Sequence, residues 1–272
     1  MSRIVFWDYG HDGSAELAAA GAVCMALAYP GRILLLNEEQ GGTGIEAGFS
    51  FPDHIRGGDI QSLPEYGMDA LQRLAANQRL TPGNFSDYTY PVIKDKLDLV
   101  SGFGVMAKKN PAMHEESLRL LYSAAEQAFD MVFTRSKHPP NYADLHIRVV
   151  ALRQNRLELE RFFDEFAHGQ PASPLADAIV LQHYDPQSRW SAANIRRRFE
   201  SKIPMFPIPY NTEFMDAWNN RNILKYIRLH RLMLHKGSLK RGILPSLLSL
   251  CEGLLELAAG RTEITQSGKR GA

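Results

Sequence analysis

The first 29 residues constrain the fold more than any other part of the chain. A short apolar run, 4–7 (IVFW), is followed by a turn that contains Gly10 and Gly13, and then by an alanine-rich helical stretch, 14–29. A strand, a glycine loop and a helix in this order present backbone N–H groups and the positive end of a helix dipole to an anion. The sequence therefore predicts an α/β fold whose first loop has the shape of a phosphate-binding site.

Apolar runs and helical patterns continue to alternate along the rest of the chain. Because the runs are continuously apolar, we expect parallel strands that are buried on both faces of the sheet. The alternation predicts a three-layer, doubly wound α/β fold, with a mostly parallel sheet of about seven strands and helices on both faces. The predicted strands are 4–7, 32–37, 97–101, 129–134, 145–152, 178–183 and 205–208. The predicted helices are 14–29, 65–78, 112–127, 156–166, 191–200, a helix from 212 or 222 to 235, and 243–259.

We expect one α/β domain with a C-terminal addition. The domain spans 1–237, because no linker in that range is long enough to divide it. A C-terminal amphipathic helix within 238–260 repeats apolar residues at i, i+3 and i+4, so it should pack on the domain or on a partner. Residues 261–272 are predicted to form a disordered tail, and 38–64 a loop with a short helix near Ile45.

The overall composition is that of a soluble globular protein. Hydrophobic residues make up 44% and charged residues 22% of the chain, and the net charge of +1 excludes a global attraction to nucleic acid or acidic lipid. The N-terminus lacks a secretory signal pattern and no 18 consecutive residues are apolar, so we expect a cytoplasmic protein without a membrane span. Cys24 and Cys251 lie in apolar helical patterns, which favours buried thiols over a disulfide or a metal site.

Three segments together resemble the ParA/MinD family, the deviant Walker A P-loop ATPases of the SIMIBI class. They are the opening strand, loop and helix, the run 129–133 (FDMVF) and the run 203–212 (IPMFPIPYNT). The resemblance covers about residues 1–235 and is closest to diverged members such as the pilus-localisation proteins TadZ and CpaE. It implies a mostly parallel sheet of seven or eight strands, with a nucleotide site at the first loop and the proline-containing loop on its purine side.

The first loop departs from the family's KGGxGK[ST][ST] motif at the positions that perform the chemistry. Residues 9–16 read YGHDGSAE, in which both glycines fit the motif. The signature lysine falls on Tyr9, the phosphate-binding lysine on Ser14 and the magnesium-ligand hydroxyl on Ala15. Phosphoryl transfer depends on charge neutralisation by that lysine and the metal. The sequence therefore predicts a degenerate nucleotide loop that keeps its shape, and the alternative is an ordinary turn of an α/β core.

Charge at the predicted site also opposes a nucleotide. Asp12 and Glu16 would repel a polyphosphate, and Arg135 stands where the family has an acidic residue at the end of a strand. We expect no catalytic residue, no metal and no bound cofactor, with ATP disfavoured. A weak nucleotide-dependent switch that borrows Arg135 or Lys94 as its cation is the enzymatic alternative. The candidate site comprises Tyr9, Gly10, His11, Asp12, Gly13, Ser14 and Ala15 in the loop, with Arg135, Pro207 and Pro209 nearby.

Two other patterns are weaker signals of function. The glycines at 41–44 resemble a dinucleotide loop, but they follow the second strand rather than the first, which favours a surface loop. The nine histidines show no metal-binding spacing. His11 and Asp12 could form an acid/base pair, but no nucleophile accompanies them.

These patterns favour a non-catalytic ParA/MinD-like protein, a positioning or regulatory scaffold that binds a second copy or a protein partner. We assign no small-molecule substrate. The basic runs at 196–198 and 225–241 favour solvated helix faces, and contact with DNA, an acidic partner or lipid headgroups is the alternative. The C-terminal helix leaves open a membrane-peripheral or pilus-assembly adaptor, although Glu252 and Glu256 interrupt its apolar stripe.

Overall fold

One mixed sheet runs through the protein. The computed structural model describes residues 2–39, 41, 44–50, 66–104, 111–138, 146–168, 176–235 and 242–269. Its strands are β1 (Ser2–Asp8), β2 (Ile33–Asn37), β3 (Tyr90–Ile93), β4 (Leu97–Val100), β5 (Met131–Ser136), β6 (His146–Arg153), β7 (Ala178–Tyr184) and β8 (Met205–Pro209). They form an eight-stranded sheet in the order β3-β4-β2-β5-β1-β6-β7-β8.

The strand pairing confirms the mostly parallel sheet. Every neighbouring pair is parallel except β3 and β4, which are antiparallel. All seven predicted strands are present, and β3 is the additional one. It is a short edge strand that contains Pro91, a residue that weakens a strand pattern in sequence but is tolerated at a sheet edge.

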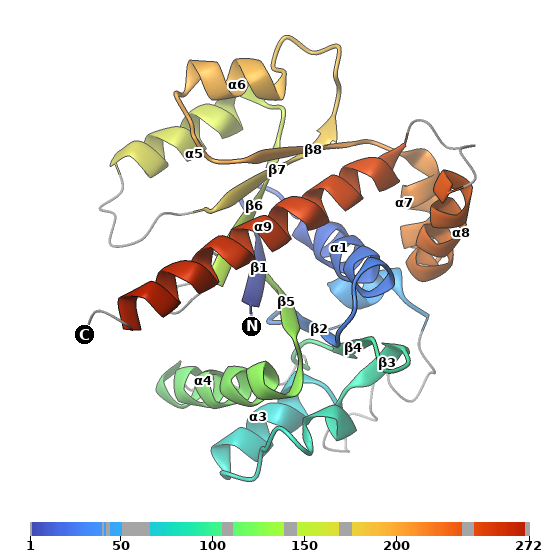
Figure 1. Cartoon of the computed structure of the whole chain (residues 1–272), viewed down its shortest axis with the longest axis vertical. Helices are drawn as coiled ribbons and strands as arrows, with labels where there is room; N and C mark the ends of the chain where they lie inside the picture. The colour runs from blue at the N-terminus through green and yellow to red at the C-terminus, as the bar shows by residue number, and fades with distance from the viewer. Residues whose placement is uncertain are drawn as a thin grey trace.

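Helices cover both faces of the sheet, as predicted (Figure 1). The helices are α1 (Ser14–Ala28), α3 (Met68–Ala76), α4 (Pro111–Ala128), α5 (Arg156–His168), α6 (Ala192–Arg198), α7 (Thr212–Asn219), α8 (Ile223–His235) and α9 (Ile243–Lys269), with short 3₁₀ turns η1 (Ile45–Gly48) and η2 (Phe85–Tyr88). Because side chains alternate along a strand, Phe6 enters the core under α1, α8 and α9, whereas its neighbour Trp7 enters the core under α5 and α6. Helices α3 and α4 cover a third cluster, built on Leu34 and Leu36.

The C-terminal helix belongs to the domain core. In Figure 1, α9 crosses the sheet beside α1. Its residues Leu247, Leu250 and Leu254 are fully buried in the same cluster as α1. Ile243–Gly260 is long and apolar enough to cross a membrane by length and composition, and 39% of it is buried inside the protein. The burial of its apolar side explains that hydrophobicity without a membrane.

Two predicted boundaries differ from the structure. The segment ending at 235 is two helices, α7 and α8, because the chain turns at Arg221, which has a left-handed φ of 58°. Helix α9 continues to Lys269, where we expected a disordered tail after Gly260. No proline interrupts that stretch, and each added residue extends the existing helix by one hydrogen bond. The short helix near Ile45 is confirmed as η1, and 51–65 lie outside the described residues.

Candidate functional site

The loop from 9 to 13 joins the end of β1 to the start of α1 at the carboxyl edge of the sheet. Gly10 has a φ of 74°, a left-handed conformation that a glycine adopts without the clash a Cβ would cause. Gly13 directly precedes α1, so the first N–H groups of the helix lack partners within the helix and point toward the loop. The local geometry is that of an anion cradle, as the sequence predicts.

An acidic side chain of the protein itself fills the cradle. Oδ1 of Asp8, the last residue of β1, accepts hydrogen bonds from the backbone N–H of Gly13, with 2.9 Å between N and Oδ1, and of Ser14, at 2.7 Å. These donors are the groups that would face a bound phosphate in such a loop. The Asp8 carboxylate therefore occupies the position of the anion.

Arg135 neutralises this internal anion. Its Nη2 lies 2.9 Å from Oδ2 of Asp8, and the two side chains are only 6% and 7% exposed. The same Nη2 is 3.4 Å from Oδ1 of Asp12, and Nε donates to Oγ of Ser14 at 3.4 Å. Strands β1 and β5 are parallel neighbours in which Phe6 pairs with Arg135, so the pair meets at one edge of the sheet. The cation in the loop thus comes from β5 and not from the loop itself.

His11 connects the other side of the loop to helix α5 and strand β7. Its Nδ1 faces the backbone carbonyl of Tyr9 at 3.1 Å and Oε1 of Glu158 at 3.2 Å, and its Nε2 lies 2.8 Å from Oε1 of Gln182. Nε2 of Gln182 donates to the backbone carbonyl of Gly13 at 2.5 Å. All three partners of His11 are acceptors, so the doubly protonated ring satisfies them best. Burial disfavours the charged ring, but the hydrogen bonds to Glu158 and Gln182 prevail and raise its pKa.

The remaining loop residues do not form a catalytic set. The ring of Tyr9 packs edge-on against Phe162 of α5, with 5.3 Å between ring centroids. Burial, and then a hydrogen bond with Glu165, raises the pKa of the Tyr9 hydroxyl. Ala15 is buried in the first turn of α1, and burial raises the pKa of the neighbouring Glu16.

Only one of the two predicted prolines lies beside the loop. Pro209 lines a narrow hollow of about 30 Å³ together with Glu16, Gln182 and Tyr210. That volume holds one or two water molecules and is far below the roughly 300 Å³ of a small-molecule site. Pro207, on the edge strand β8, pairs with Leu181 of β7 and is not part of the hollow's lining.

The structure places the second predicted cation away from the loop. Lys94 lies in the exposed turn between β3 and β4, before the amino end of β4. The first loop follows β1 at the carboxyl edge, and β2 and β5 lie between β4 and β1, so Lys94 cannot act there. Among the described residues, no three His, Cys, Asp or Glu side chains gather where they could hold a metal ion.

Sequence reasoning missed the residues that hold the loop closed: Asp8, Glu158 and Gln182. Asp8 carried a signal, because an acidic residue directly follows the apolar run 4–7, and the neighbouring strand β5 carries Arg135 near its end. Glu158 and Gln182 reach the loop from α5 and β7, and their sequence separations from His11 give no local pattern. The polar groups of the loop are thus engaged with one another.

Comparisons with known proteins bear on the fold. No protein-family model matches the sequence, and no curated protein is similar enough in sequence to count as a relative. Solved structures do match over nearly the whole chain. A ParA family ATPase from Chlorobium tepidum has a TM-score of 0.66 at 14% identity, covering 92% of this chain and 98% of its own.

Two further neighbours are MinD proteins. MinD from Pyrococcus horikoshii, complexed with Mg-ADP, has a TM-score of 0.59 at 12% identity and covers 95% of this chain and 98% of its own. MinD in the MinC:MinD cell division complex of Aquifex aeolicus has a TM-score of 0.57 at 10% identity, over 94% and 96%. This chain therefore has the ParA/MinD fold.

Proposed function

We propose that this chain, which has the ParA/MinD fold, is a non-catalytic scaffold that positions or regulates other proteins by binding a second copy or a protein partner. The observation that carries the proposal is the Asp8 carboxylate in the anion cradle. A phosphate could use the same N–H groups only after displacing a carboxylate that is also paired with Arg135. Breaking a buried ion pair is costly, because it leaves a charge without its partner.

Charge and space support the same proposal. Ser14 and Ala15 stand where the ATPases have a lysine and a magnesium-ligand hydroxyl, so neither the charge nor the metal that phosphoryl transfer requires is supplied by the loop. Asp12, 80% exposed at its side chain, adds negative charge at the mouth of the loop. The narrow hollow beside Pro209 leaves no room for a nucleotide base in this conformation.

Calorimetry with ATP and ADP, with and without magnesium, tests the absence of nucleotide binding. We expect no binding up to millimolar nucleotide. A side chain at Gly13 collides with Gln182 and blocks the cradle, so Gly13→Trp should abolish any binding of nucleotide there. Micromolar, magnesium-dependent binding by the wild type that Gly13→Trp abolishes would overturn the proposal. Gly83→Trp is the matched control, since a side chain at Gly83 meets only the Thr81 hydroxyl at ordinary contact distance.

The surface around the loop supports a binding role. Leu157, at the start of α5, is 63% exposed, and Tyr210, just after β8, is 57% exposed. Leu157 precedes Glu158, which contacts His11, and Tyr210 lines the hollow with Glu16, so both exposed residues belong to segments that contact the loop or its first helical turn. The MinC:MinD neighbour is a fold relative captured with a protein partner. We place the protein in the cytoplasm and prefer a protein partner to DNA or a membrane surface.

Light scattering coupled to gel filtration tests self-association through this surface. Leu157→Glu with Tyr210→Glu should shift a dimer toward monomer, because a carboxylate buried in an apolar contact costs several kilocalories per mole. Leu120→Glu on α4, which is 45% exposed and away from the loop, is the control. A dimer that all variants retain, or that Leu120→Glu alone disrupts, would place the interface elsewhere. If the wild type is a monomer, the surface around Leu157 and Tyr210 would instead bind a different protein.

The membrane-adaptor alternative is weaker. Helix α9 uses its apolar side in the core, so docking on a membrane through that side would require it to leave the domain. Flotation of the full chain with anionic liposomes tests this alternative. Recovery of the protein in the lipid fraction, lost at high salt or not, would favour the adaptor over the scaffold that we propose.

A further inference from the structure

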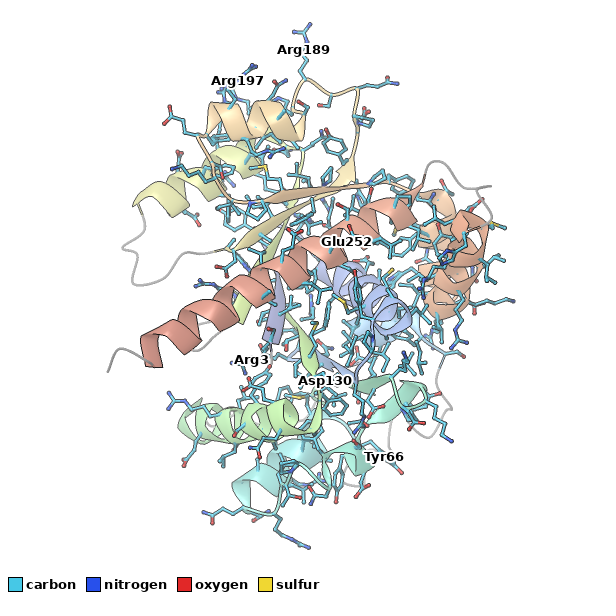
Figure 2. All side chains as sticks on the ribbon, in the orientation of Figure 1. Arg3, Tyr66, Asp130, Arg189, Arg197 and Glu252 are labelled. Atoms are coloured by element: carbon cyan, nitrogen blue, oxygen red, sulfur yellow. The ribbon has the colours of Figure 1, made fainter. Side chains whose placement is uncertain are left out.

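A second charged surface lies where the chain passes from β7 into α6. A hollow of about 330 Å³ is lined by Arg189, Trp190, Asn194, Arg197 and Arg198, and we call it the Arg–Trp hollow. Figure 2 shows Arg189 and Arg197 projecting outward at this end of the molecule. A hollow of this volume is within the range of ligand-binding sites.

The positive charge of the hollow is partly fixed in place. Arg198 donates to Oε1 of Glu160 at 3.1 Å, and Arg197 donates to Oδ1 of Asn194 at 3.0 Å. Arg189 and Arg197 are both exposed, and neither contacts a carboxylate in a described ion pair. Of the three arginines that line the hollow, only Arg198 is in a described ion pair, so the guanidinium groups of Arg189 and Arg197 remain available to a ligand.

The backbone of the hollow is held by side-chain hydrogen bonds. Nε2 of Gln154 donates to the carbonyls of Asp185 and Trp190, at 3.1 and 2.9 Å, and Oε1 of Gln154 accepts from the N–H of Asp185 at 2.8 Å. Nδ2 of Asn194 donates to the carbonyl of Arg189 at 2.8 Å. A loop pinned at both ends loses little conformational entropy when a ligand binds.

Trp190 supplies an apolar wall. Its ring is half-buried against the cluster under α5 and α6, and the guanidinium carbon of Arg198 lies 5.1 Å from the ring centroid. Tryptophan and arginine are the residue types that most often dominate the energy of protein–protein interfaces. The planar guanidinium groups can also hold carboxylates through two parallel hydrogen bonds.

We propose that the Arg–Trp hollow binds an acidic segment of a protein partner, with carboxylates on Arg189 and Arg197 and an apolar side chain against Trp190. Arg189, Arg197 and Arg198 converge on one hollow, whereas the exposed acids Asp185 and Glu200 interrupt the positive charge on the adjoining chain segments. A nucleic acid needs an uninterrupted row of cations along its backbone. A short acidic peptide needs only two or three carboxylate contacts. The lining of the hollow contains no residue of the first loop, so this proposal does not depend on the loop's nucleotide state.

Fluorescence anisotropy tests the proposal with three labelled probes: a peptide of glutamates interspersed with phenylalanine, the same peptide with lysine replacing glutamate, and a single-stranded oligonucleotide. We expect the full-length protein to bind the acidic peptide most tightly. Arg189→Glu with Arg197→Glu should weaken that binding at least tenfold. The control is Lys225→Glu with Arg228→Glu on α8, which changes the net charge equally on exposed residues of another surface and should weaken it less than twofold.

Three results would overturn the proposal. One is the absence of acidic-peptide binding by the wild-type protein. A second is an equal loss in the two double variants, which would indicate general electrostatic attraction. The third is tighter binding of the oligonucleotide than of the acidic peptide. Gly13→Trp alters the first loop, whereas Arg189→Glu with Arg197→Glu alters the hollow, so the two proposals are tested by different variants and failure here leaves the scaffold proposal to its own test.

Discussion

Oδ2 of Asp8 and Nη2 of Arg135 lie 2.9 Å apart at the carboxyl edge of the sheet, and both side chains are almost completely buried. The other oxygen of Asp8 accepts two N–H groups at the start of α1. One carboxylate therefore joins strand β5, strand β1 and helix α1. The same contact closes the place where a phosphate would bind in a loop of this shape.

Breaking this ion pair should destabilise the fold more than removing both charges. Arg135→Met leaves Asp8 buried without a cation, and we expect it to lower the free energy of unfolding by about 3 kcal/mol or more. Asp8→Asn with Arg135→Met should lose less, because the Asn oxygen still accepts the two N–H groups without a charge. Urea denaturation of the wild type, both single variants and the double variant measures the coupling. Strictly additive losses would show that the pair makes no joint contribution.

The left-handed backbone at Gly10 should make that position intolerant of a side chain. Gly10→Ala should lower the free energy of unfolding by about 1 kcal/mol, because its φ of 74° brings a Cβ into a clash with the backbone. Gly260→Ala is the matched substitution within α9, where nothing lies near the added methyl group. There we expect the free energy of unfolding to increase by about 0.5–1 kcal/mol, because alanine stabilises a helix interior more than glycine does. A loss of equal size at both positions would contradict this account.

The His11 contacts should make the loop sensitive to pH. The pKa of His11 is raised in the folded protein, so its protonation stabilises the fold fully below about pH 6.5, the ordinary value for histidine. This contribution should disappear as the pH rises through the higher folded-state value. The wild type should therefore have a larger free energy of unfolding than His11→Gln at mildly acidic pH, and this difference should decrease as the pH becomes alkaline. His138→Gln, at an exposed position, is the control; a difference that grows with pH would contradict the assignment.

The two cysteines should be unreactive in the native protein. Cys24 and Cys251 are free and buried, and burial raises the pKa of Cys251 to about 12 and that of Cys24 well above its ordinary value. A thiol-specific disulfide reagent at pH 8 should therefore modify neither cysteine until urea unfolds the protein. Rapid modification of either thiol without denaturant would show that α1 and α9 separate in the native state.

Sequence patterns predicted the architecture because a strand that is buried on both faces of the sheet appears in the sequence as a continuous apolar run. They missed β3, whose Pro91 and exposed positions hide an edge strand, and the break at Arg221 between α7 and α8. At the loop, the sequence showed which residues of the resembled motif are absent, and it offered Arg135 as a cation. It did not show that Asp8, Gln182 and Glu158 would meet there, because these residues and Arg135 come from four different elements and approach one another only when the sheet assembles.

In the first loop, the Asp8 carboxylate takes the place of a bound anion in the cradle. Replacing Asp8 by alanine removes that anion and leaves two N–H groups and Arg135 facing the gap. Formate, which is the size of the missing carboxylate, should then raise the melting temperature of Asp8→Ala, whereas chloride at the same ionic strength should not. Asp8→Asn, which keeps an acceptor oxygen, and the wild type should show no such rescue. An Asp8→Ala variant that formate does not stabilise, or a wild type that formate stabilises equally, would contradict the claim.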